Sequence, residues 1–277
     1  MKILITGANG QLGRELANQY KEINSIELIL AGKVELDITD VIAVYRFVNK
    51  NKPDVIINCA ALTAVDKCET EIDMAYKINT IGPKNLAAAA NLIGAEIVQV
   101  STDYVFSGEI NKLLTEFVEV NPQTIYGKTK LEGEKLVVNH NPKHYIVRTA
   151  WLYGDGNNFV KTMLNLSKTN KTIKVVSDQR GTPTSTVDLA KVIIKLVEDK
   201  NYGLFHCTCK GECTWYEFTK EIFRLKGITT EVLPCTTDEF KRPAKRPEYS
   251  VLKNYMLELT TGDTTRSWQE AIEEYLR

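Results

Sequence analysis

The feature that most constrains the fold is a run of three glycines, spaced three residues apart, directly after the first apolar segment. Residues 2–6 have the pattern of a strand, and Gly7, Gly10 and Gly13 follow it before a helical pattern begins. Gly7 permits a tight turn, Gly10 lets the backbone approach a pyrophosphate, and Gly13 lets the helix pack close to the sheet. The free N–H groups and the dipole of the helix then favour an anion. The pattern predicts a dinucleotide site; the alternative is a glycine-rich turn without a ligand.

The first 150 residues alternate short apolar runs with helical patterns. Fully apolar strands separated by helices indicate a parallel sheet covered on both faces, and its crossovers are expected to be right-handed. We therefore predict an α/β fold with a Rossmann-type doubly wound parallel sheet. The expected strands are 2–6, 26–30, 54–59, 96–100 and 145–148, and the expected helices are 10–21, 39–51, 73–91 and 126–140.

The alternation loosens after residue 150, which indicates a smaller C-terminal substrate-binding α/β lobe. We expect residues 1–150 and about 185–210 to form the dinucleotide-binding domain. Residues of about 151–184 and 211–277 would form the second lobe. The predicted elements are helices at 159–169, 186–198, 215–226 and from 267, strands at 172–176 and 203–209, and a polar turn at 177–184.

Charge and apolar content exclude several classes of protein. The chain of 277 residues has 35 Lys plus Arg and 35 Asp plus Glu, so no basic surplus indicates binding to nucleic acid or to an anionic membrane surface. No apolar run approaches the roughly 20 residues that a membrane span needs. We expect a cytoplasmic protein.

The six cysteines are expected to be reduced. A chain of this size has its own core and does not need disulfides. Cys207, Cys209 and Cys213 have a spacing that fits no common zinc pattern, and no second ligand pair follows. No metal site is predicted.

A tyrosine and a lysine four residues apart, Tyr126 and Lys130, lie in a helical segment and therefore share one face. The ordinary pKa of tyrosine is about 10, and a nearby ammonium would lower it toward the working pH of an acid–base catalyst. Alone, such a pair is usually a surface coincidence. Thr102 changes that interpretation, because it ends a predicted strand at the sheet edge where ligands bind in open α/β folds.

Taken together, these motifs resemble the extended short-chain dehydrogenase/reductase family over essentially the whole chain. Within that family the chain is similar to the reductases of dTDP-linked keto-sugars. The segments that carry the resemblance are GANGQLG (7–13), NCAALTAVD (58–66), STDYVF (101–106), YGKTK (126–130), RTAWLYG (148–154), DQRGTPT (178–184) and RPEYS (246–250).

The resemblance implies an oxidoreductase of dTDP-rhamnose biosynthesis that reduces the C4 ketone of dTDP-4-dehydro-L-rhamnose to dTDP-L-rhamnose. Tyr126 would be the general acid, Lys130 would hold the nicotinamide ribose, and Thr102 would complete the catalytic triad.

The resemblance also implies a substrate site for this dTDP-linked deoxy-keto-sugar. Thr102, Asp103, Val105 and Trp151 would line it, while Arg180 and Arg246 would contact the diphosphate. Each of the last three has a plainer interpretation. Trp151 could be a core residue, Arg180 could support its own loop, and Arg246 could belong to a solvated basic loop.

The cofactor is expected to be NADPH or NADH. Dinucleotide sites that select NAD place an acid near the end of the second strand, and Lys33 follows that strand here, so the sequence favours NADPH. The predicted cofactor-binding residues are Gly7, Asn9, Gly10, Gln11, Leu12, Gly13, Lys33, Asp37, Ile38, Ala60, Ala61, Thr63, Tyr126 and Lys130.

Two other functions stay open at this point. A nucleotide-sugar epimerase or dehydratase of the same family would keep its cofactor and return the hydride. A non-catalytic NADP-binding regulatory subunit would not need Tyr126 and Lys130. The sequence is compatible with a monomer or a homodimer.

Overall fold

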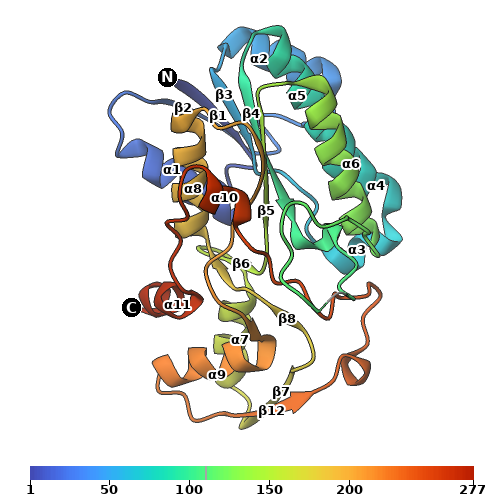
Figure 1. Cartoon of the computed structure of the whole chain (residues 1–277), viewed down its shortest axis with the longest axis vertical. Helices are drawn as coiled ribbons and strands as arrows, with labels where there is room; N and C mark the ends of the chain where they lie inside the picture. Colours follow the sequence, from blue (N-terminus) through green and yellow to red (C-terminus); the bar gives the residue numbers. More distant parts are fainter. Residues whose placement is uncertain (110) are drawn as a thin grey trace.

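The computed structural model describes residues 1–109 and 111–277 and has a parallel six-stranded sheet at its centre (Figure 1). The strand order is β2-β1-β3-β4-β5-β10, and every neighbouring pair is parallel. This confirms the predicted doubly wound sheet. The strands are β1 (Lys2–Thr6), β2 (Glu27–Ala31), β3 (Val55–Asn58), β4 (Glu96–Thr102), β5 (His144–Thr149) and β10 (Gly203–His206).

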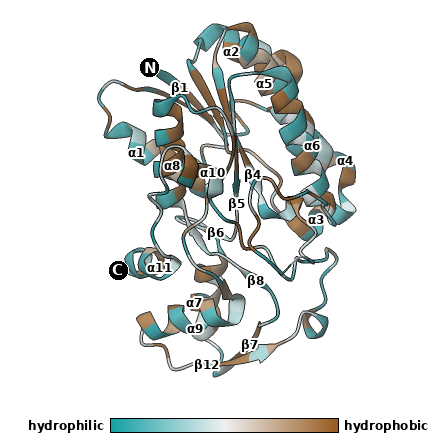
Figure 2. Cartoon of the chain, viewed as in Figure 1, coloured by the Kyte–Doolittle hydropathy of each residue, from teal (hydrophilic) through white to brown (hydrophobic). Residues whose placement is uncertain are grey.

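Helices cover both faces of the sheet, and each face has its own apolar core. On one face, α1 contributes the buried Leu16 and Tyr20 and α8 contributes the buried Ile193. Val44 and Leu86 are buried against the other face, under α2 and α5. Figure 2 shows the sheet strands in brown between helices whose outer surfaces are teal. The helices are α1 (Gln11–Lys21), α2 (Val41–Asn51), α3 (Val65–Thr70), α4 (Ile72–Tyr76), α5 (Gly82–Leu92), α6 (Ile125–His140) and α8 (Thr186–Asp199).

A second lobe lies below the carboxyl ends of the strands in the orientation of Figure 1. Its core includes Phe218, Ile222 and Trp268, all of them buried. The strands pair as β6 with β9, β7 with β12 and β8 with β11. The elements of the second lobe are β6 (Leu152–Tyr153), α7 (Phe159–Ser167), β7 (Thr172–Val176), β8 (Arg180–Gly181), β9 (Thr184–Ser185), β11 (Cys213–Thr214), α9 (Trp215–Leu225), β12 (Glu231–Cys235), a 3-10 turn at Asp238–Phe240 and α11 (Trp268–Leu276). The short helix α10 (Tyr255–Leu259) packs instead against β10 of the sheet, and a 3-10 turn, Asp103–Val105, follows β4.

One predicted helix, 73–91, is interrupted. Between α4 and α5 the chain forms a π-helical turn, Lys77–Ile81. Pro83 explains the interruption, because it has no N–H to donate to the carbonyl of Asn79, four residues earlier, and its ring crowds that carbonyl. The Asn79 carbonyl instead faces Gly133 on α6, where an added Cβ would lie only 2.2 Å from it.

Two strand predictions also differ from the structure. The strand expected at 203–209 ends at His206, since Thr208 turns away and donates its N–H to the side chain of Asn254. Strand β12 was not predicted, and it contains Pro234. β12 pairs with β7 in a two-stranded sheet, so a residue without an N–H can be accommodated on its open edge. Within the described residues, no helix is long and apolar enough to cross a membrane.

Candidate active site

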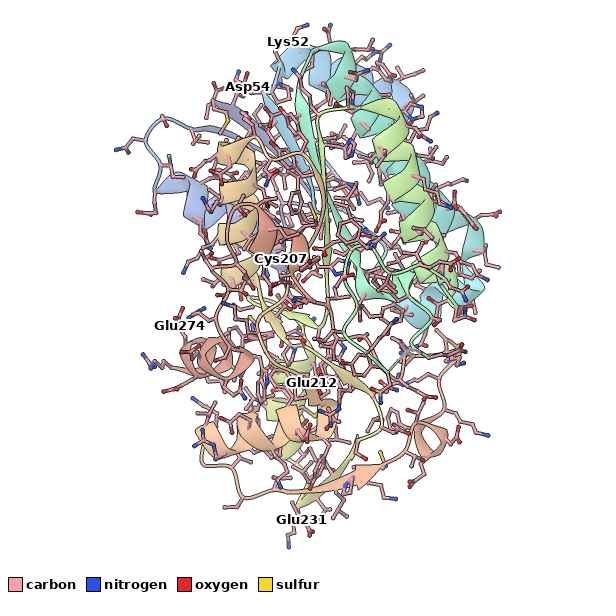
Figure 3. The ribbon with its side chains drawn as sticks, in the orientation of Figure 1. Lys52, Asp54, Cys207, Glu212, Glu231 and Glu274 are labelled. Atoms are coloured by element: carbon pink, nitrogen blue, oxygen red, sulfur yellow. The ribbon has the colours of Figure 1, made fainter. Side chains whose placement is uncertain are left out.

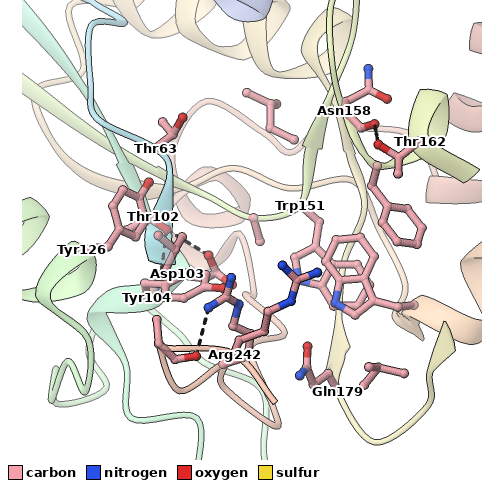
Figure 4. A pocket seen from close by; sticks show the side chains of 18 of the residues that line it. Thr63, Thr102, Asp103, Tyr104, Tyr126, Trp151, Asn158, Thr162, Gln179 and Arg242 are labelled. Atoms are coloured by element: carbon pink, nitrogen blue, oxygen red, sulfur yellow. Dashed lines mark hydrogen bonds between the residues drawn. The ribbon is translucent and has the colours of Figure 1, made fainter. Parts of the chain in front are cut away.

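A cavity of about 1500 Å³ lies at the carboxyl ends of the sheet strands and extends into the second lobe. Its size is sufficient for more than one small ligand. In Figure 4, Tyr126, Thr102 and Asp103 lie together on one side of the cavity, and Trp151 lies opposite. The predicted site residues that line it are Gly10, Gln11, Leu12, Gly13, Ala61, Thr63, Thr102, Asp103, Tyr126, Lys130, Trp151 and Arg246.

Each glycine of the turn at the end of β1 is required for a different steric reason. Gly7 has a φ of +65°, and an added Cβ would lie 2.6 Å from the backbone nitrogen of Ala60. At Gly13 a Cβ would lie 2.5 Å from the carbonyl oxygen of Gly7. Gly10 is exposed and has much more room, with that same oxygen 3.2 Å from its added Cβ. Gly7 and Gly13 therefore shape the turn, whereas Gly10 opens it toward the cavity.

The N-terminus of α1 can accept an anion. Its N-cap is Gly10, which provides no side-chain cap, and the first turn carries no acidic residue. Backbone N–H groups at such a terminus need a partner, and the helix dipole favours a negative one. The residues present therefore fit the pyrophosphate of a dinucleotide.

The same helix is joined to the second lobe. The Gln11 side chain accepts hydrogen bonds from the N–H of Gly154 at 3.0 Å and from Asn158 at 3.1 Å. One turn later, Arg14 forms an ion pair with Asp155 at 3.0 Å. The loop after β6 is thereby held beside the glycine turn, where it can cover a bound dinucleotide.

The predicted catalytic residues converge because α6 begins very close to the end of β4. Thr124 caps α6 by accepting a hydrogen bond from the N–H of Gly127 at 3.0 Å. An added Cβ at Gly127 would lie 2.1 Å from the carbonyl oxygen of Tyr104. This close approach brings Tyr126, in the first turn of α6, beside Thr102 at the end of β4 (Figure 4).

The pKa of Tyr126 differs from the sequence-based expectation. We expected Lys130 to lower it, but burial of the phenol raises it well above its ordinary value, and the nearby Asp103 and Tyr104 raise it further. The Thr102 hydroxyl opposes part of this rise. Without a ligand, Tyr126 is therefore a protonated phenol, which is the form that a proton donor requires.

Lys130 is fully inside the protein and binds the backbone rather than another side chain. Its Nζ donates a hydrogen bond to the carbonyl oxygen of Val100 in β4 at 2.6 Å. Burial lowers the pKa of Lys130 to about 8, and Glu134 and Cys59 counteract part of this fall. The amine thus titrates close to neutral pH.

Asp103 is a buried carboxylate at the edge of the cavity. It accepts a hydrogen bond from the Thr102 hydroxyl at 3.0 Å. Burial raises the pKa of Asp103 to about 6, although the hydroxyls of Ser250 and Thr102 act in the opposite direction. Its second carboxylate oxygen makes no hydrogen bond of good geometry within the described residues; the Ser250 hydroxyl is the nearby protein donor, and a ligand in the cavity could be a second one.

Trp151 forms the opposite wall and is held in an unusual backbone conformation. Its φ is +47°, which is rare for a bulky residue and costs about 1–3 kcal/mol. The indole stacks on Trp215, with ring centroids 3.5 Å apart, and Gly181 leaves it room, since an added Cβ there would lie 2.5 Å from the ring. Strain that the surrounding packing maintains is typical of a functional position.

Several predicted cofactor-binding residues lie outside the cavity lining. Gly7 and Ala60 form the turn behind it, and Asn9 is exposed beside Gly32. Lys33 is exposed in the loop after β2. In the same loop Asp37 binds Thr39, and Ile38 is buried beneath Gly82, so the Ile38 side chain packs in the core instead of facing a ligand.

Two of the predicted substrate residues have other contacts in the structure. Val105 is fully buried in a small core with Phe106 and Leu252, so it does not line the cavity. Arg180 lies outside the cavity lining as well, because its guanidinium pairs with Glu212 at 3.2 Å. Figure 3 shows Glu212 in the second lobe, below the sheet.

Sequence reasoning missed Asn79, which joins the loop after β3 to α6. Its side chain accepts a hydrogen bond from the N–H of Leu62 at 2.8 Å and donates to the carbonyl of Leu62 at 3.1 Å and to Thr129 at 3.2 Å. The neighbouring Thr80 donates to the carbonyl of Thr129 at 2.7 Å. The interruption at Pro83 was the available signal for this site.

The sequence analysis also did not identify the side chains that line the cavity in the second lobe. Aromatic and apolar residues come from α7, from β7 and from the start of α9, and cations come from β7 and the segment before Pro243. These residues include Phe159, Met163, Ile173, Lys174, Trp215, Lys241 and Arg242.

Comparison with known proteins identifies the relatives of this chain. Residues 1–277 match the family described as RmlD substrate binding domain. A crystal structure of a dTDP-4-dehydrorhamnose reductase from Clostridium acetobutylicum ATCC 824 is 69% identical, with a TM-score of 0.99 over 100% of this chain and 98% of that chain. A dTDP-4-dehydrorhamnose reductase from Bacillus anthracis str. Ames in complex with NADP is 44% identical, with a TM-score of 0.95 over 99% of this chain and 98% of that chain. The spore coat polysaccharide biosynthesis protein SpsK of Bacillus subtilis (strain 168) is 43% identical over 100% of this chain and 97% of its own length.

Proposed function

The chain belongs to the RmlD substrate binding domain family, and from this premise we propose that it reduces the C4 ketone of dTDP-4-dehydro-L-rhamnose to dTDP-L-rhamnose with NADPH. The observation that carries the proposal is the convergence of Thr102, Tyr126 and Lys130 on one cavity. The uncapped N-terminus of α1 opens into the same cavity, and Trp151 lies opposite Thr102 and Tyr126 (Figure 4).

NADPH would supply the hydride that reduces the ketone carbon. The backbone N–H groups at the N-terminus of α1 would hold its pyrophosphate, and Gly10 would let the backbone approach it. NADP in the Bacillus anthracis relative agrees with this choice of dinucleotide. Lys33, exposed after β2, would neutralise the 2′-phosphate.

The buried phenol of Tyr126 would donate its proton to the C4 oxygen as charge develops there. Thr102, beside Tyr126, would bind the same oxygen and orient the ketone. Lys130 would hold the nicotinamide ribose through the N–H groups that its bond to Val100 leaves available. Its positive charge stabilises the phenolate that remains after proton transfer.

The other parts of the cavity would position the nucleotide sugar. Trp151 would form an apolar wall for the sugar ring, with Asp103 accepting a hydroxyl hydrogen bond opposite. Arg242 and Lys174 line the second-lobe part of the cavity, where their charges suit the diphosphate. Phe159 and Trp215 are in contact there, with centroids 4.4 Å apart, and their rings suit a pyrimidine base.

The test is to mix dTDP-4-dehydro-L-rhamnose with the enzyme and follow NADPH and NADH at 340 nm, the wavelength at which reduced nicotinamide absorbs. We expect one NADPH to be consumed per ketone reduced. An epimerase would leave the absorbance unchanged, and loss of neither cofactor would exclude the reductase. In the Tyr126→Phe variant, turnover should fall about 10²-fold or more while NADPH binding is retained. Retained turnover would remove Tyr126 from the mechanism.

The cellular setting is part of the proposal. All six cysteines are unpaired, and Cys207, labelled in Figure 3, is fully buried at the end of β10. Unpaired buried thiols suit a reducing compartment, so we propose that the enzyme acts in the cytoplasm. Whether it is a monomer or a homodimer is to be settled by light scattering of the purified protein.

A further inference from the structure

Three consecutive residues at the end of β4 each contact a different part of the catalytic helix α6. The carbonyl of Val100 accepts the hydrogen bond from Lys130 at 2.6 Å. Ser101 donates its hydroxyl to Glu134 at 2.5 Å. Thr102 ends the strand beside Tyr126. Glu134 follows Lys130 by four residues and therefore lies on the same helix face, one turn further from the cavity.

Glu134 is bound on its other side by an arginine of the neighbouring strand. Arg148 in β5 lies directly opposite Ser101 in the sheet register. Its Nε and Nη2 donate to the two carboxylate oxygens of Glu134 at 2.9 and 2.7 Å. Glu134 and Arg148 are only 5% and 3% exposed, so solvent does not reach the pair. Inside the protein, charges act over longer distances than they do in water.

Glu134 pairs with Arg148 and also raises the pKa of Lys130, one turn away on the same helix face. The other titratable groups on the elements around Lys130 are Tyr126 on α6, Cys59 after β3 and Asp103 after β4, which line the same cavity, and Arg148 on β5. Burial raises the pKa of the Cys59 thiol to about 12 and keeps the Tyr126 phenol protonated, so neither carries charge near neutral pH. Of the described groups that favour the ammonium form of Lys130, Glu134 has the largest effect, and its carboxylate is the one that pairs with Arg148, at 2.7 Å.

We propose that Glu134, held by Ser101 and Arg148, is a positioning residue that keeps the Lys130 amine charged in a site whose burial would otherwise neutralise it. Arg148 in turn keeps Glu134 in place without reaching Lys130 itself. This inference rests on the proposed function, because the charge of Lys130 matters there for the ribose and for the phenolate of Tyr126.

The first experiment compares Glu134→Gln with the wild type from pH 5.5 to 9.5. Two quantities are measured: kcat/KM for the keto-sugar and the Kd of NADPH. Gln keeps the shape and one hydrogen-bond acceptor but removes the charge. We expect the activity lost on the alkaline side to be lost at least one pH unit earlier in the variant. At pH 6, where Lys130 is protonated in both proteins, kcat/KM should differ by less than about threefold, and at pH 8.5 by about tenfold or more.

A second variant guards against loss of folding. Glu134→Gln leaves Arg148 buried without its partner, which can unfold a protein. The double variant Glu134→Gln with Arg148→Met removes both charges and keeps apolar volume, and its melting temperature should exceed that of Glu134→Gln. It should show the same early alkaline loss, because Glu134 rather than Arg148 acts on Lys130.

Glu116→Gln is the matched control. Glu116 is another buried glutamate in the neighbourhood of Arg148, and it accepts hydrogen bonds from the N–H groups of His206 at 2.8 Å and Met256 at 3.1 Å. Its replacement should lower the melting temperature without changing the alkaline pH at which kcat/KM falls.

The outcomes separate the inference from the proposed function. The inference would be overturned if kcat/KM of both Glu134 variants fell at the same alkaline pH as in the wild type. An equal loss of activity at every pH would overturn it as well. If the wild type does not oxidise NADPH with the keto-sugar, the proposed function fails. The NADPH Kd series then still decides the inference: Kd should begin to rise at least one pH unit lower in the variants than in the wild type.

Discussion

Arg246 binds the carboxylate of Asp66 through both terminal nitrogens, at 2.6 and 2.8 Å. The pair joins the segment of residues 237–247, which lines the cavity, to the first turn of α3, which follows the cavity-lining loop after β3. Asp66 also accepts the N–H of Ala244, and Arg246 donates back to the Ala244 carbonyl at 2.9 Å. A solvated basic loop, one of the two sequence-based interpretations, therefore does not describe Arg246.

Replacing Arg246 by Gln should loosen the segment that closes the cavity. Asp66 would lose its bidentate partner, and the Arg246 side chain is only 21% exposed, so we expect a loss of about 1–3 kcal/mol in the free energy of unfolding. The KM for the dTDP-sugar should rise about tenfold, which corresponds to about 1.4 kcal/mol, with a smaller change in kcat. Urea unfolding and steady-state kinetics measure the two effects.

Arg180→Gln is the control for Arg246. Arg180 pairs with Glu212 near the surface, where both side chains are more than a third exposed, and such pairs contribute about 0–1 kcal/mol. KM and stability should stay near the wild-type values. A tenfold rise in KM for Arg180→Gln would return this residue to the substrate site, as the sequence originally suggested.

Asp103 should make the protein less stable as the pH rises from 4 to 6. Its pKa is about 6 in the folded protein against an ordinary value near 4, so between these values the folded state binds more protons than the unfolded state. Stability that Asp103 contributes below pH 4 is therefore lost as the pH rises to 6. The pKa difference of about two corresponds to roughly 3 kcal/mol.

The Asp103→Asn variant removes this titration. Compared with the wild type, it should gain about 2 kcal/mol in relative stability between pH 4.5 and pH 7.5, measured by urea unfolding at both values, because part of the full effect has already been lost at pH 4.5. Residues of active sites are often destabilising because function requires them. We therefore expect kcat/KM to fall in the same variant that gains stability. A constant difference in stability at the two pH values would show that Asp103 does not titrate between them.

Asn79 should contribute to both stability and cofactor binding. In the Asn79→Ala variant the half-buried N–H and carbonyl of Leu62 lose their partner, at about 1 kcal/mol for each unpaired group. The loop after β3 carries Ala61 and Thr63 into the cavity, so the Kd of NADPH should rise about tenfold.

Asn141→Ala serves as the comparison for Asn79. Asn141 is equally buried, at the far end of α6, and donates to the carbonyl of Ala95 at 3.0 Å. It should lower the melting temperature while the Kd of NADPH, measured by fluorescence titration, is unchanged. Equal Kd values for the two variants would reduce Asn79 to a packing residue.

The sequence predicted the sheet and its helices, and it named candidate catalytic residues that the structure brings to one cavity, for a physical reason. Apolar periodicity and glycine spacing are local signals, and Thr102, Tyr126 and Lys130 lie next to elements that these signals define. The partners of Arg180 and Arg246 could not be predicted, since Glu212 and Asp66 are 32 and 180 residues away along the chain. The pKa of Tyr126 was predicted in the wrong direction, because its burial depends on packing across α6, β4 and the loop after β3.

The glycine turn offers the sharpest separation of ligand binding from folding. Gly10 and Gly13 lie three residues apart, and Ala at either position removes the same backbone freedom. At Gly13 the new Cβ would lie 2.5 Å from the Gly7 carbonyl oxygen and 2.7 Å from Ala8 Cα, so backbone atoms must move, and we expect a large drop in melting temperature. At Gly10 the nearest atom, the Gly7 carbonyl oxygen, is 3.2 Å away, so a shift of a few tenths of an ångström suffices and the melting temperature should fall much less than in Gly13→Ala. The Gly10 methyl group would instead occupy space that the pyrophosphate needs, so the Kd of NADPH should rise at least tenfold in Gly10→Ala. If Gly10→Ala binds NADPH as tightly as the wild type, the cofactor does not lie on this turn, whatever the stability of Gly13→Ala.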